Sequence, residues 1–316
     1  EGFSSEQRTF TSRGKRVLGL GWRSLAQMGV TSAAMLDGLE RSTLECQLEC
    51  SGLLILDSPL KPQSKPAIHQ LIQSSHRVVV ITGDNPLTAC SVASQVGILS
   101  KPRTSQLILQ NDLLWHPVAA QHEAQEEEKE VTVPFKDNAD SILRLSITHD
   151  LCVTGGALVA LADKYGTKQQ ARSHEVPARL MRPISTNVLV FARTAPVQKE
   201  RILTSLKSQG YTTLMCGDGT NDVGALKQAD VGISIINSIE MDKKAEIVTA
   251  IAKKKRMKRK KGNNTGTGNE ELHSLLREME MESQSHHVQL GDASVASGFT
   301  SKTASIACAL DVIRQG

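Results

Sequence analysis

The densest group of chemically capable side chains lies in one glycine-rich loop, Cys216-Gly217-Asp218-Gly219-Thr220-Asn221-Asp222. Its two glycines let the backbone turn tightly, and Asp218 and Asp222 supply hard oxygen ligands beside the start of an expected helix. Asn221 can donate to a phosphate oxygen or cap that helix. We therefore expect a Mg²⁺ and phosphate site here, with Asp218 and Asp222 as metal ligands. The alternative is an ordinary Asp/Gly turn.

A second loop, Thr82-Gly83-Asp84-Asn85, follows the apolar run HRVVVI in the same way. The Thr82 hydroxyl and successive backbone N–H groups can hold a phosphoryl oxygen, and Pro86 suits the first turn of the next helix. Thr-Gly-Asp is also a common turn. Lys199, one turn into a helix that opens at Pro196, offers a positive charge for the same phosphate, although surface lysines are usually only solvated.

These loops need strands before them and helices after them, and the sequence supplies both. Short apolar or β-branched runs alternate with helix-like stretches over residues 52–99 and 151–235, which predicts an α/β fold with a doubly wound parallel sheet. Ligands bind such sheets at the carboxyl ends of the strands, where the loops after Ile81 and Cys216 fall. The low aromatic content of 3% fits strands built from Val, Leu, Ile and Ala.

Three segments depart from this alternation. Residues 101–140 contain Pro117, Pro134 and a cluster of glutamates, so we expect an exposed insertion there, with Leu107–Leu109 as a candidate strand. A polar loop is expected between the helix that ends near Lys164 and the strand at 187–192. Residues 253–261 read KKKRMKRKK without interleaved aromatic residues, so we expect a solvated, disordered arm and no nucleic-acid partner. Contact of this arm with anionic lipid is the alternative.

Bulk properties exclude several classes of protein. With 39% hydrophobic residues, 22% charged residues and a net charge of +4, the chain is neither a fibre nor wholly disordered. Its longest weakly polar run, residues 151–162, falls short of the roughly 20 residues that a membrane span requires. Six cysteines without a CxxC pair predict reduced thiols. The first residues lack Met and an apolar stretch, so we expect a cut within a longer chain.

Taken in chain order, the Thr82 loop, Lys199 and the Asp218 loop resemble the last three motifs of the haloacid-dehalogenase-like phosphotransferases. More specifically, three stretches of sequence resemble the phosphorylation domain of P-type ATPases: ITGDNPLTA (81–89), VFARTAPVQKE (190–200) and MCGDGTNDVGALKQADVGI (215–233). Three further stretches look most like the A branch of the fifth P-type class, the endoplasmic-reticulum polypeptide dislocases: PLTAC (86–90), DVGAL (222–226) and LGDASVASGFTSK (290–302). The resemblance covers most of 14–236 and resumes at 288–316.

This resemblance implies a role for each matching residue. Asp218 would bind Mg²⁺, supported by Asp222 and Asn221, which also lie near the phosphate. Lys199 and Thr82 would contact the phosphoryl group on the catalytic aspartate. Gly83 and Asp84 would lie beside the nucleotide, ATP, which Arg193 would help to hold. Arg16, in GKRVLGL, matches an arginine that reaches the ATP phosphates, and its alternative is an ordinary surface arginine beside a strand.

The resemblance also implies a division of the chain. Residues 1–44 would be the C-terminal remnant of a nucleotide-binding domain, and 45–236 a haloacid-dehalogenase-like phosphorylation domain with the insertion at about 101–140. Residues 237–287 would form the basic and polar arm, and 288–316 the segment that leads to a missing membrane helix.

The departures from the family matter as much as the matches. The family forms an aspartyl phosphate on the Asp of DKTGT, which this sequence lacks. The nearest wording, DKYGT at Asp163–Thr167, follows the Thr82 loop instead of preceding it and carries Tyr in place of the first Thr, so we do not expect Asp163 to be the nucleophile. The adenosine-pocket motif, the actuator's TGE and every membrane helix are also missing.

We therefore expect the cytosolic part of a multi-pass, ATP-driven translocase of the endoplasmic-reticulum membrane that dislocates polypeptides. This chain is expected to be inactive alone because it lacks the phosphorylated Asp motif, and its expected partners are the membrane and actuator domains of the same polypeptide. One alternative is a non-catalytic, truncated module that binds nucleotide or Mg²⁺. The other is a free-standing haloacid-dehalogenase-like phosphatase, which would need its own Asp-x-Asp before Thr82, and none is visible.

Overall fold

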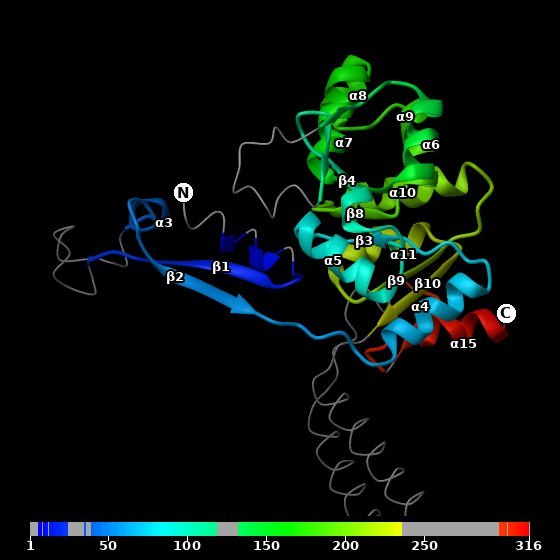
Figure 1. Cartoon of the computed structure of the whole chain (residues 1–316), viewed down its shortest axis with the longest axis horizontal. Helices are drawn as coiled ribbons and strands as arrows, with labels where there is room; N and C mark the ends of the chain where they lie inside the picture. The colour runs from blue at the N-terminus through cyan, green and yellow to red at the C-terminus, as the bar shows by residue number, and fades with distance from the viewer. Residues whose placement is uncertain are drawn as a thin grey trace, which may run out of the picture. The chain divides into compact units, whose positions relative to one another are not determined.

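The computed structural model describes residues 6–7, 9–11, 13–24, 35, 39–118, 132–235, 297–301 and 303–315. The chain divides into two compact units. Figure 1 labels helices and strands of both units. The first unit comprises Glu1–Leu60, Val78–Val176 and Asn187–Arg193, and the second comprises Lys61–Arg77, Pro177–Thr186 and Thr194–Gly316. Each unit is described by itself.

The first unit contains a six-stranded mixed sheet with the strand order β3-β8-β7-β4-β5-β6. Its strands are β3 (Val80–Ile81), β4 (Gln106–Leu109), β5 (Leu114–Pro117), β6 (Val133–Pro134), β7 (Asp150–Thr154) and β8 (Val190–Ala192). Strands β3, β8, β7 and β4 are parallel, whereas β5 and β6 pair in antiparallel fashion. The predicted α/β class is confirmed, but the sheet is mixed and not wholly parallel.

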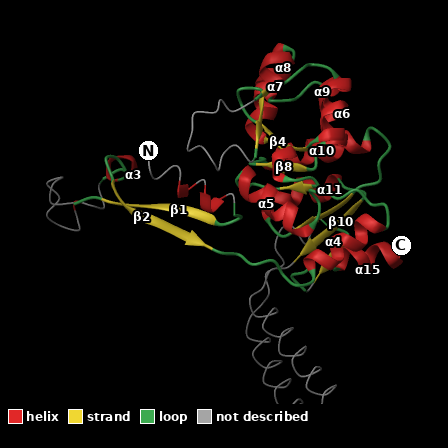
Figure 2. Cartoon of the chain, viewed as in Figure 1, coloured by secondary structure: helices red, strands yellow, loops and turns green. Residues whose placement is uncertain are grey.

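The two central strands of this sheet are buried along their whole length. Every residue of β4 and β7 is buried, and Leu107, Ile108 and Leu109 are at most 4% exposed. Helix α5 (Pro86–Val96) packs against β8 and β7, while α6 (Ala139–Thr148) and α7 (Gly155–Tyr165) pack against β7. Figure 2 shows this succession of short strands and helices. Such coverage favours continuous apolar strands.

The range 101–140 differs from the exposed insertion that its prolines and glutamates suggested. The described part of this range holds the short 3-10 helix η2 (Arg103–Ser105) and strands β4, β5 and β6 of the sheet. Trp115 is 2% and Phe135 8% exposed, so this segment contributes to the core. Pro134 is the last residue of β6, the edge strand on this side of the sheet, where a missing N–H is tolerated, and Pro117 is the last residue of β5. The glutamates at 123–130 lie outside the described residues.

The expected polar loop before the 187–192 strand is also wrong. Its residues form α8 (Lys168–Ser173) and α9 (Ala178–Asn187). In α9, Leu180, Met181 and Ile184 are at most 7% exposed while polar residues surround them in sequence. This narrow stripe at helical spacing is enough to bury one face, even though the segment is polar on average.

A two-stranded ribbon precedes the sheet in sequence. Strand β1 (Arg16–Trp22) pairs in antiparallel fashion with β2 (Glu49–Leu56), from Arg16 opposite Leu56 to Trp22 opposite Glu49. The short helix α3 (Arg41–Leu44) lies between them in the chain. This ribbon joins strands on both sides of the proposed domain boundary at residue 44.

The second unit contains a three-stranded parallel sheet with the order β11-β10-β9. Its strands are β9 (Leu214–Gly217), β10 (Val231–Ile235) and β11 (Phe299–Ser301). Its helices include α4 (Ser64–Gln73), α10 (Pro196–Lys207), the 3-10 helix η4 (Thr220–Asp222), α11 (Val223–Gln228) and α15 (Cys308–Gln315).

Helix α11 packs against α10, β9 and β10, and a core forms from Leu203, Met215, Ala225 and Leu226. The parallel pairing of β11 with β10 shows that the last described segment belongs to this unit. The expected basic arm at 253–261 lies outside the described residues. In the part of the chain that is described, no helix is both long enough and apolar enough to cross a membrane.

Candidate functional site

The Thr82 loop is closed by hydrogen bonds at the carboxyl end of β3. The Thr82 hydroxyl accepts from the Asp84 N–H at 3.1 Å and donates to Asp84 Oδ2 at 3.2 Å. The Thr82 N–H donates to the Phe191 carbonyl at 2.8 Å, which fixes the loop against β8. The next helix begins as predicted, because Asn85 Oδ1 accepts from the Leu87 N–H at 2.9 Å and Pro86 occupies the first turn.

Arg193 joins this loop from the end of β8. Its N–H donates to the Asp84 carbonyl at 3.0 Å, so the loops after two neighbouring strands are tied together. Its φ of 52° lies in the left-handed region, which is uncommon for a residue other than glycine. Such a conformation persists only where neighbouring contacts impose it, and the guanidinium group remains exposed. The first unit thus places Thr82, Gly83, Asp84 and Arg193 in two loops that are hydrogen-bonded to each other, and their predicted role at a nucleotide remains a prediction.

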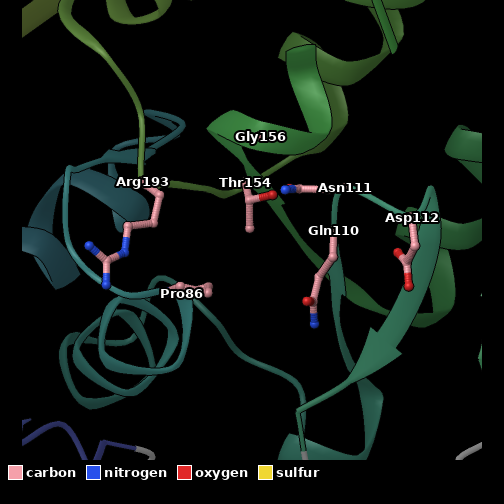
Figure 3. A pocket seen from close by; sticks show the side chains of 7 residues that line it. All are labelled: Pro86, Gln110, Asn111, Asp112, Thr154, Gly156 and Arg193. Carbon is pink, nitrogen blue, oxygen red and sulfur yellow. The ribbon is translucent and has the colours of Figure 1, made fainter. Parts of the chain in front are cut away.

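A cavity of about 480 Å³ opens beside Arg193, at the carboxyl ends of β4, β7 and β8 (Figure 3). In Figure 3, Arg193 and Pro86 lie on one side of this cavity and Asp112 on the other, with Gln110 between them. The full lining is Pro86, Gln110, Asn111, Asp112, Thr154, Gly156 and Arg193. The arginine can hold a carboxylate or phosphate through its planar fork of donors.

Thr154 and Gly156 shape the wall of this cavity. Thr154 Oγ1 accepts from the Ala157 N–H at 3.1 Å, which caps α7, and donates to the Leu109 carbonyl at 3.1 Å. A Cβ at Gly156 would overlap the Asn111 side chain, which would have to move to admit any larger residue. The sequence analysis missed both residues, although the sequence VTGG at the end of β7 repeats the strand-Thr-Gly pattern of the Thr82 loop.

Asp112 keeps a negative charge in this cavity. Burial acts to raise the pKa of its carboxyl group, but the hydrogen bond from the Leu114 N–H and the His116 ring outweigh burial, so the pKa is lowered. The two contacts measure 3.0 Å to the Leu114 nitrogen and 2.8 Å to His116 Nε2. The cavity therefore has a cationic and an anionic side.

The second group of predicted residues meets in the second unit. Lys199 Nζ donates to Asp222 Oδ1 at 2.8 Å, and the side chain of each is only 10% exposed. Asp218, directly after β9, is exposed to solvent, as is Asn221. Asn221 does not cap α11, because Asp222 precedes that helix and provides no side-chain cap. The sequence analysis placed Lys199 and Asp222 at a phosphate and Mg²⁺ site, but it did not predict that Asp222 forms an ion pair with Lys199.

Two close approaches hold this ion pair in place. A Cβ at Gly217 would lie 2.5 Å from the Asp222 Cβ, so glycine is required where β9 meets the loop. Glu200, next to Lys199 on α10, accepts from Gln228 Nε2 on α11 at 3.1 Å. The packing of α10 against α11 therefore sets the distance between Lys199 and Asp222.

These donors fit a magnesium ion that shares its coordination with phosphate. Mg²⁺ is held in proteins by one or two carboxylates together with water and substrate phosphates. Within the described ranges, no group of three or more His, Cys, Asp and Glu side chains could hold a metal ion. Asp218 is an exposed carboxylate that can serve as such a ligand, whereas Asp222 Oδ1 already binds Lys199. The side chains of this loop therefore supply only part of the ligands that a Mg²⁺ ion needs, and phosphate and water would supply the rest.

The remaining candidates lie elsewhere. Arg16 is exposed on β1, in the two-stranded ribbon and not in the six-stranded sheet. Asp163 lies within α7, with Oδ1 3.8 Å from His174 Nδ1 and a side chain that is 54% exposed. It is therefore not at the carboxyl end of a strand, where the reactive loops of this fold class lie.

Comparisons with known proteins agree on one group. No protein-family model matches the chain. It is 41% identical over 242 residues to the endoplasmic reticulum transmembrane helix translocase of Saccharomyces cerevisiae, covering 74% of this chain and 18% of that protein. It is 35% identical over 342 residues to the probable manganese-transporting ATPase PDR2 of Arabidopsis thaliana, covering 97% of this chain and 26% of that protein.

A third relative is the probable cation-transporting ATPase 13A4 of Homo sapiens, which is 32% identical over 241 residues, or 74% of this chain and 19% of that protein. The chain thus spans between 18% and 26% of the length of these three relatives.

Proposed function

This chain belongs to the P-type ATPase family, and we propose that it forms the part of an ATP-driven membrane translocase that contacts the phosphoryl group and its Mg²⁺. We assign residues 45–236 to a haloacid-dehalogenase-like phosphorylation domain and residues 1–44 to the end of a nucleotide-binding domain. Residues 237–287 would form an arm and 288–316 the approach to a membrane helix.

The observation that carries this proposal is the buried pair of Lys199 and Asp222 beside the exposed Asp218. A lysine held 2.8 Å from a carboxylate has a fixed position, so its charge can be directed at a phosphoryl oxygen without reorganisation. Asp218 remains available to bind Mg²⁺, which when bound would neutralise charge on the transferring phosphate. Asn221, exposed on the same loop, is a further donor for the phosphate.

In the first unit, we assign contacts with ATP and its phosphates to Thr82, Gly83, Asp84 and Arg193. The Thr82 hydroxyl would orient a phosphoryl oxygen, and the exposed guanidinium of Arg193 would hold an ATP phosphate. Arg16 would be a second phosphate ligand. ATP is the proposed substrate.

The sequence as printed contains no DKTGT, so we propose that this chain does not turn over alone. Incubation with Mg²⁺ and γ-labelled ATP should give no hydroxylamine-labile phosphoenzyme. Its appearance would overturn the proposal, and loss of that label in Asp163→Ala would assign the nucleophile to Asp163.

The metal assignment has its own test. Mn²⁺, which accepts the same oxygen ligands as Mg²⁺, is titrated into the full chain with inorganic phosphate and followed by electron paramagnetic resonance. Asp218→Asn should lose the phosphate-dependent Mn²⁺ binding, whereas Asp163→Asn, at an exposed position on α7, should retain it. Equal binding by all three proteins would contradict the role of Asp218.

We further propose that the parent protein is a multi-pass translocase of the endoplasmic-reticulum membrane, with this region on the cytosolic side. Support comes from the higher identity to the yeast transmembrane helix translocase, 41%, than to human ATPase 13A4, 32%. The cargo would be polypeptide, and the partners would be the membrane and actuator domains of the same polypeptide. An ATPase assay on the full parent protein with Lys199→Met should show loss of turnover, and unchanged turnover would contradict the assignment.

A further inference from the structure

The cavity beside Arg193 has a positive charge on one side and a negative charge on the other. Arg193 and Pro86 line one side, Asp112 lines the opposite side, and Gln110 lies between them (Figure 3). The cavity measures about 480 Å³, within the range of roughly 300–1,000 Å³ that is usual for small-molecule sites. All of its lining residues belong to the first unit, so no part of the second unit is needed to form it.

A tight turn between β4 and β5 holds the negative side in place. The Gln110 N–H donates to the Leu114 carbonyl at 3.2 Å, and the Leu113 N–H donates to the Gln110 carbonyl at 3.0 Å. Leu113 has a φ of 58°, in the left-handed region, and its side chain is buried. Such a conformation persists only where neighbouring contacts impose it. Asp112, which directly precedes this anchored leucine, therefore has a fixed backbone position.

The Asp112 carboxylate can accept further hydrogen bonds. Its Oδ1 accepts from the Leu114 N–H at 3.0 Å, and its Oδ2 lies 2.8 Å from His116 Nε2. An ionised carboxylate has about four acceptor positions, so these two contacts leave some of them free. The Asp112 side chain is 47% exposed, against 15% for His116. A cation that enters the cavity can therefore reach the carboxylate.

Three other polar groups of the lining are available to a ligand. Within the described ranges, no hydrogen bond uses the Arg193 guanidinium or the side-chain amides of Gln110 and Asn111. The Arg193 backbone is fixed by the hydrogen bond from its N–H to the Asp84 carbonyl, at 3.0 Å. Each side-chain amide can both donate and accept. The cavity thus combines two opposite charges with two amide groups.

These groups together select a ligand that carries both charges. A simple anion would be attracted by Arg193 but repelled by Asp112, and a simple cation would meet the reverse. The two charges line opposite sides of the cavity, so the charges of the ligand must also be separated. In a free amino acid, a single carbon joins the ammonium and carboxylate groups. A peptide separates these groups and adds amide groups between them.

We propose that this cavity binds a short zwitterionic peptide of two or three residues. The peptide carboxylate binds the Arg193 guanidinium through two parallel hydrogen bonds, and the ammonium group binds Asp112. The peptide N–H and C=O groups bond to the amides of Gln110 and Asn111. Under the proposed function Arg193 also holds an ATP phosphate, so peptide and ATP would compete for this arginine.

The experiment titrates diglycine and triglycine into the full chain, without nucleotide or metal, and follows binding by isothermal titration calorimetry. We expect at least one of the two peptides to bind, and glycine to bind more weakly. N-acetylation of the bound peptide removes its ammonium group, and C-terminal amidation removes its carboxylate group. Each blocked peptide should bind roughly tenfold more weakly or worse, because a hydrogen bond between charged groups is lost.

Substitutions at the two sides identify which residue holds which end. Arg193→Gln should weaken binding of the free peptide roughly tenfold or more, but should change binding of the amidated peptide little, because that peptide has no carboxylate. Asp112→Asn should act in the same way toward the N-acetylated peptide. Arg193→Lys keeps the charge and should retain part of the binding, which separates loss of a contact from loss of folding. Arg144→Gln and Asp140→Asn, at exposed positions on α6, are matched controls and should bind as the parent does.

The proposal is overturned if neither peptide binds, or if the blocked peptides bind as tightly as the free peptide. It is also overturned if Arg193→Gln and Asp112→Asn bind the free peptide as tightly as the controls do. Every variant retains Lys199, Asp218 and Asp222, and no measurement depends on ATP or Mg²⁺. Failure here is therefore separate from failure of the proposed function.

Discussion

Replacing Lys199 by Met removes one partner of a buried ion pair and leaves the Asp222 carboxylate without its counter-charge. Lys199 is 8% and Asp222 7% exposed, so water cannot easily take over the lost contact. Breaking such a pair from one side typically costs about 3–5 kcal/mol. Since about 1.4 kcal/mol corresponds to a tenfold change, the lower value raises the equilibrium constant for opening of the second unit roughly 150-fold.

The same helix offers a matched control. Lys207 of α10 also binds an aspartate, with Nζ 3.1 Å from Asp230 Oδ1, but these side chains are 37% and 36% exposed. Pairs in contact with water contribute about 0–1 kcal/mol, so Lys207→Met should have a much smaller effect. The double variant Lys199→Met/Asp222→Leu removes both buried charges and should regain most of the loss, because no unpaired carboxylate remains.

Native-state hydrogen exchange, followed by mass spectrometry at increasing urea concentrations, measures this opening separately in peptides from α10 and β9. We expect a large increase in exchange for Lys199→Met, a small increase for Lys207→Met, and near-parental exchange for the double variant. The reasoning is refuted if the two lysine variants behave alike, or if the double variant is no more stable than Lys199→Met.

Three further predictions concern single positions. Gly217→Ala should destabilise the second unit by about 1–3 kcal/mol in urea unfolding, because its Cβ would lie 2.5 Å from Asp222 Cβ. Gly219→Ala is the control and should be tolerated, because the nearest atom to its Cβ is 3.9 Å away. Equal effects of the two substitutions would contradict this reasoning. Thr154→Val should cost about 1–2 kcal/mol in thermal unfolding, since it removes the α7 cap while keeping the side-chain shape, and an unchanged midpoint would exclude that role. The hydrogen bond from the Thr213 N–H, with those from Lys207 and the Thr213 hydroxyl, lowers the pKa of Asp230, so these bonds stabilise the fold above about pH 4 and are lost as the pH falls through the lowered value. The stability difference between the parent and Asp230→Asn should therefore shrink in urea titrations below about pH 4, and a constant difference would refute this assignment.

The sequence predicted best what depends on neighbours along the chain. The helix starts at Pro86 and Pro196, and the loops after β3 and β9, follow from proline, glycine and aspartate at fixed local positions. The mixed character of the sheet did not follow, because Trp115 and Phe135 become core residues only when β5 and β6 pair beside β4. Helix α9 was missed since its average composition is polar and its buried stripe is narrow.

In the candidate site, too, the sequence did not predict the contacts that depend on tertiary packing. Lys199 and Asp222 were both predicted near phosphate, but their mutual ion pair depends on how α10 packs against α11, which residue types alone do not specify. The two aspartates of the loop therefore have different roles. Asp222 holds Lys199 in an ion pair, and Asp218 is the exposed carboxylate that can bind a metal ion. The two aspartates should therefore respond differently to substitution, with Asp218→Asn affecting Mn²⁺ binding at unchanged stability and Asp222→Leu alone destabilising the second unit. Similar stability losses for both would mean that the ion pair has no special structural role.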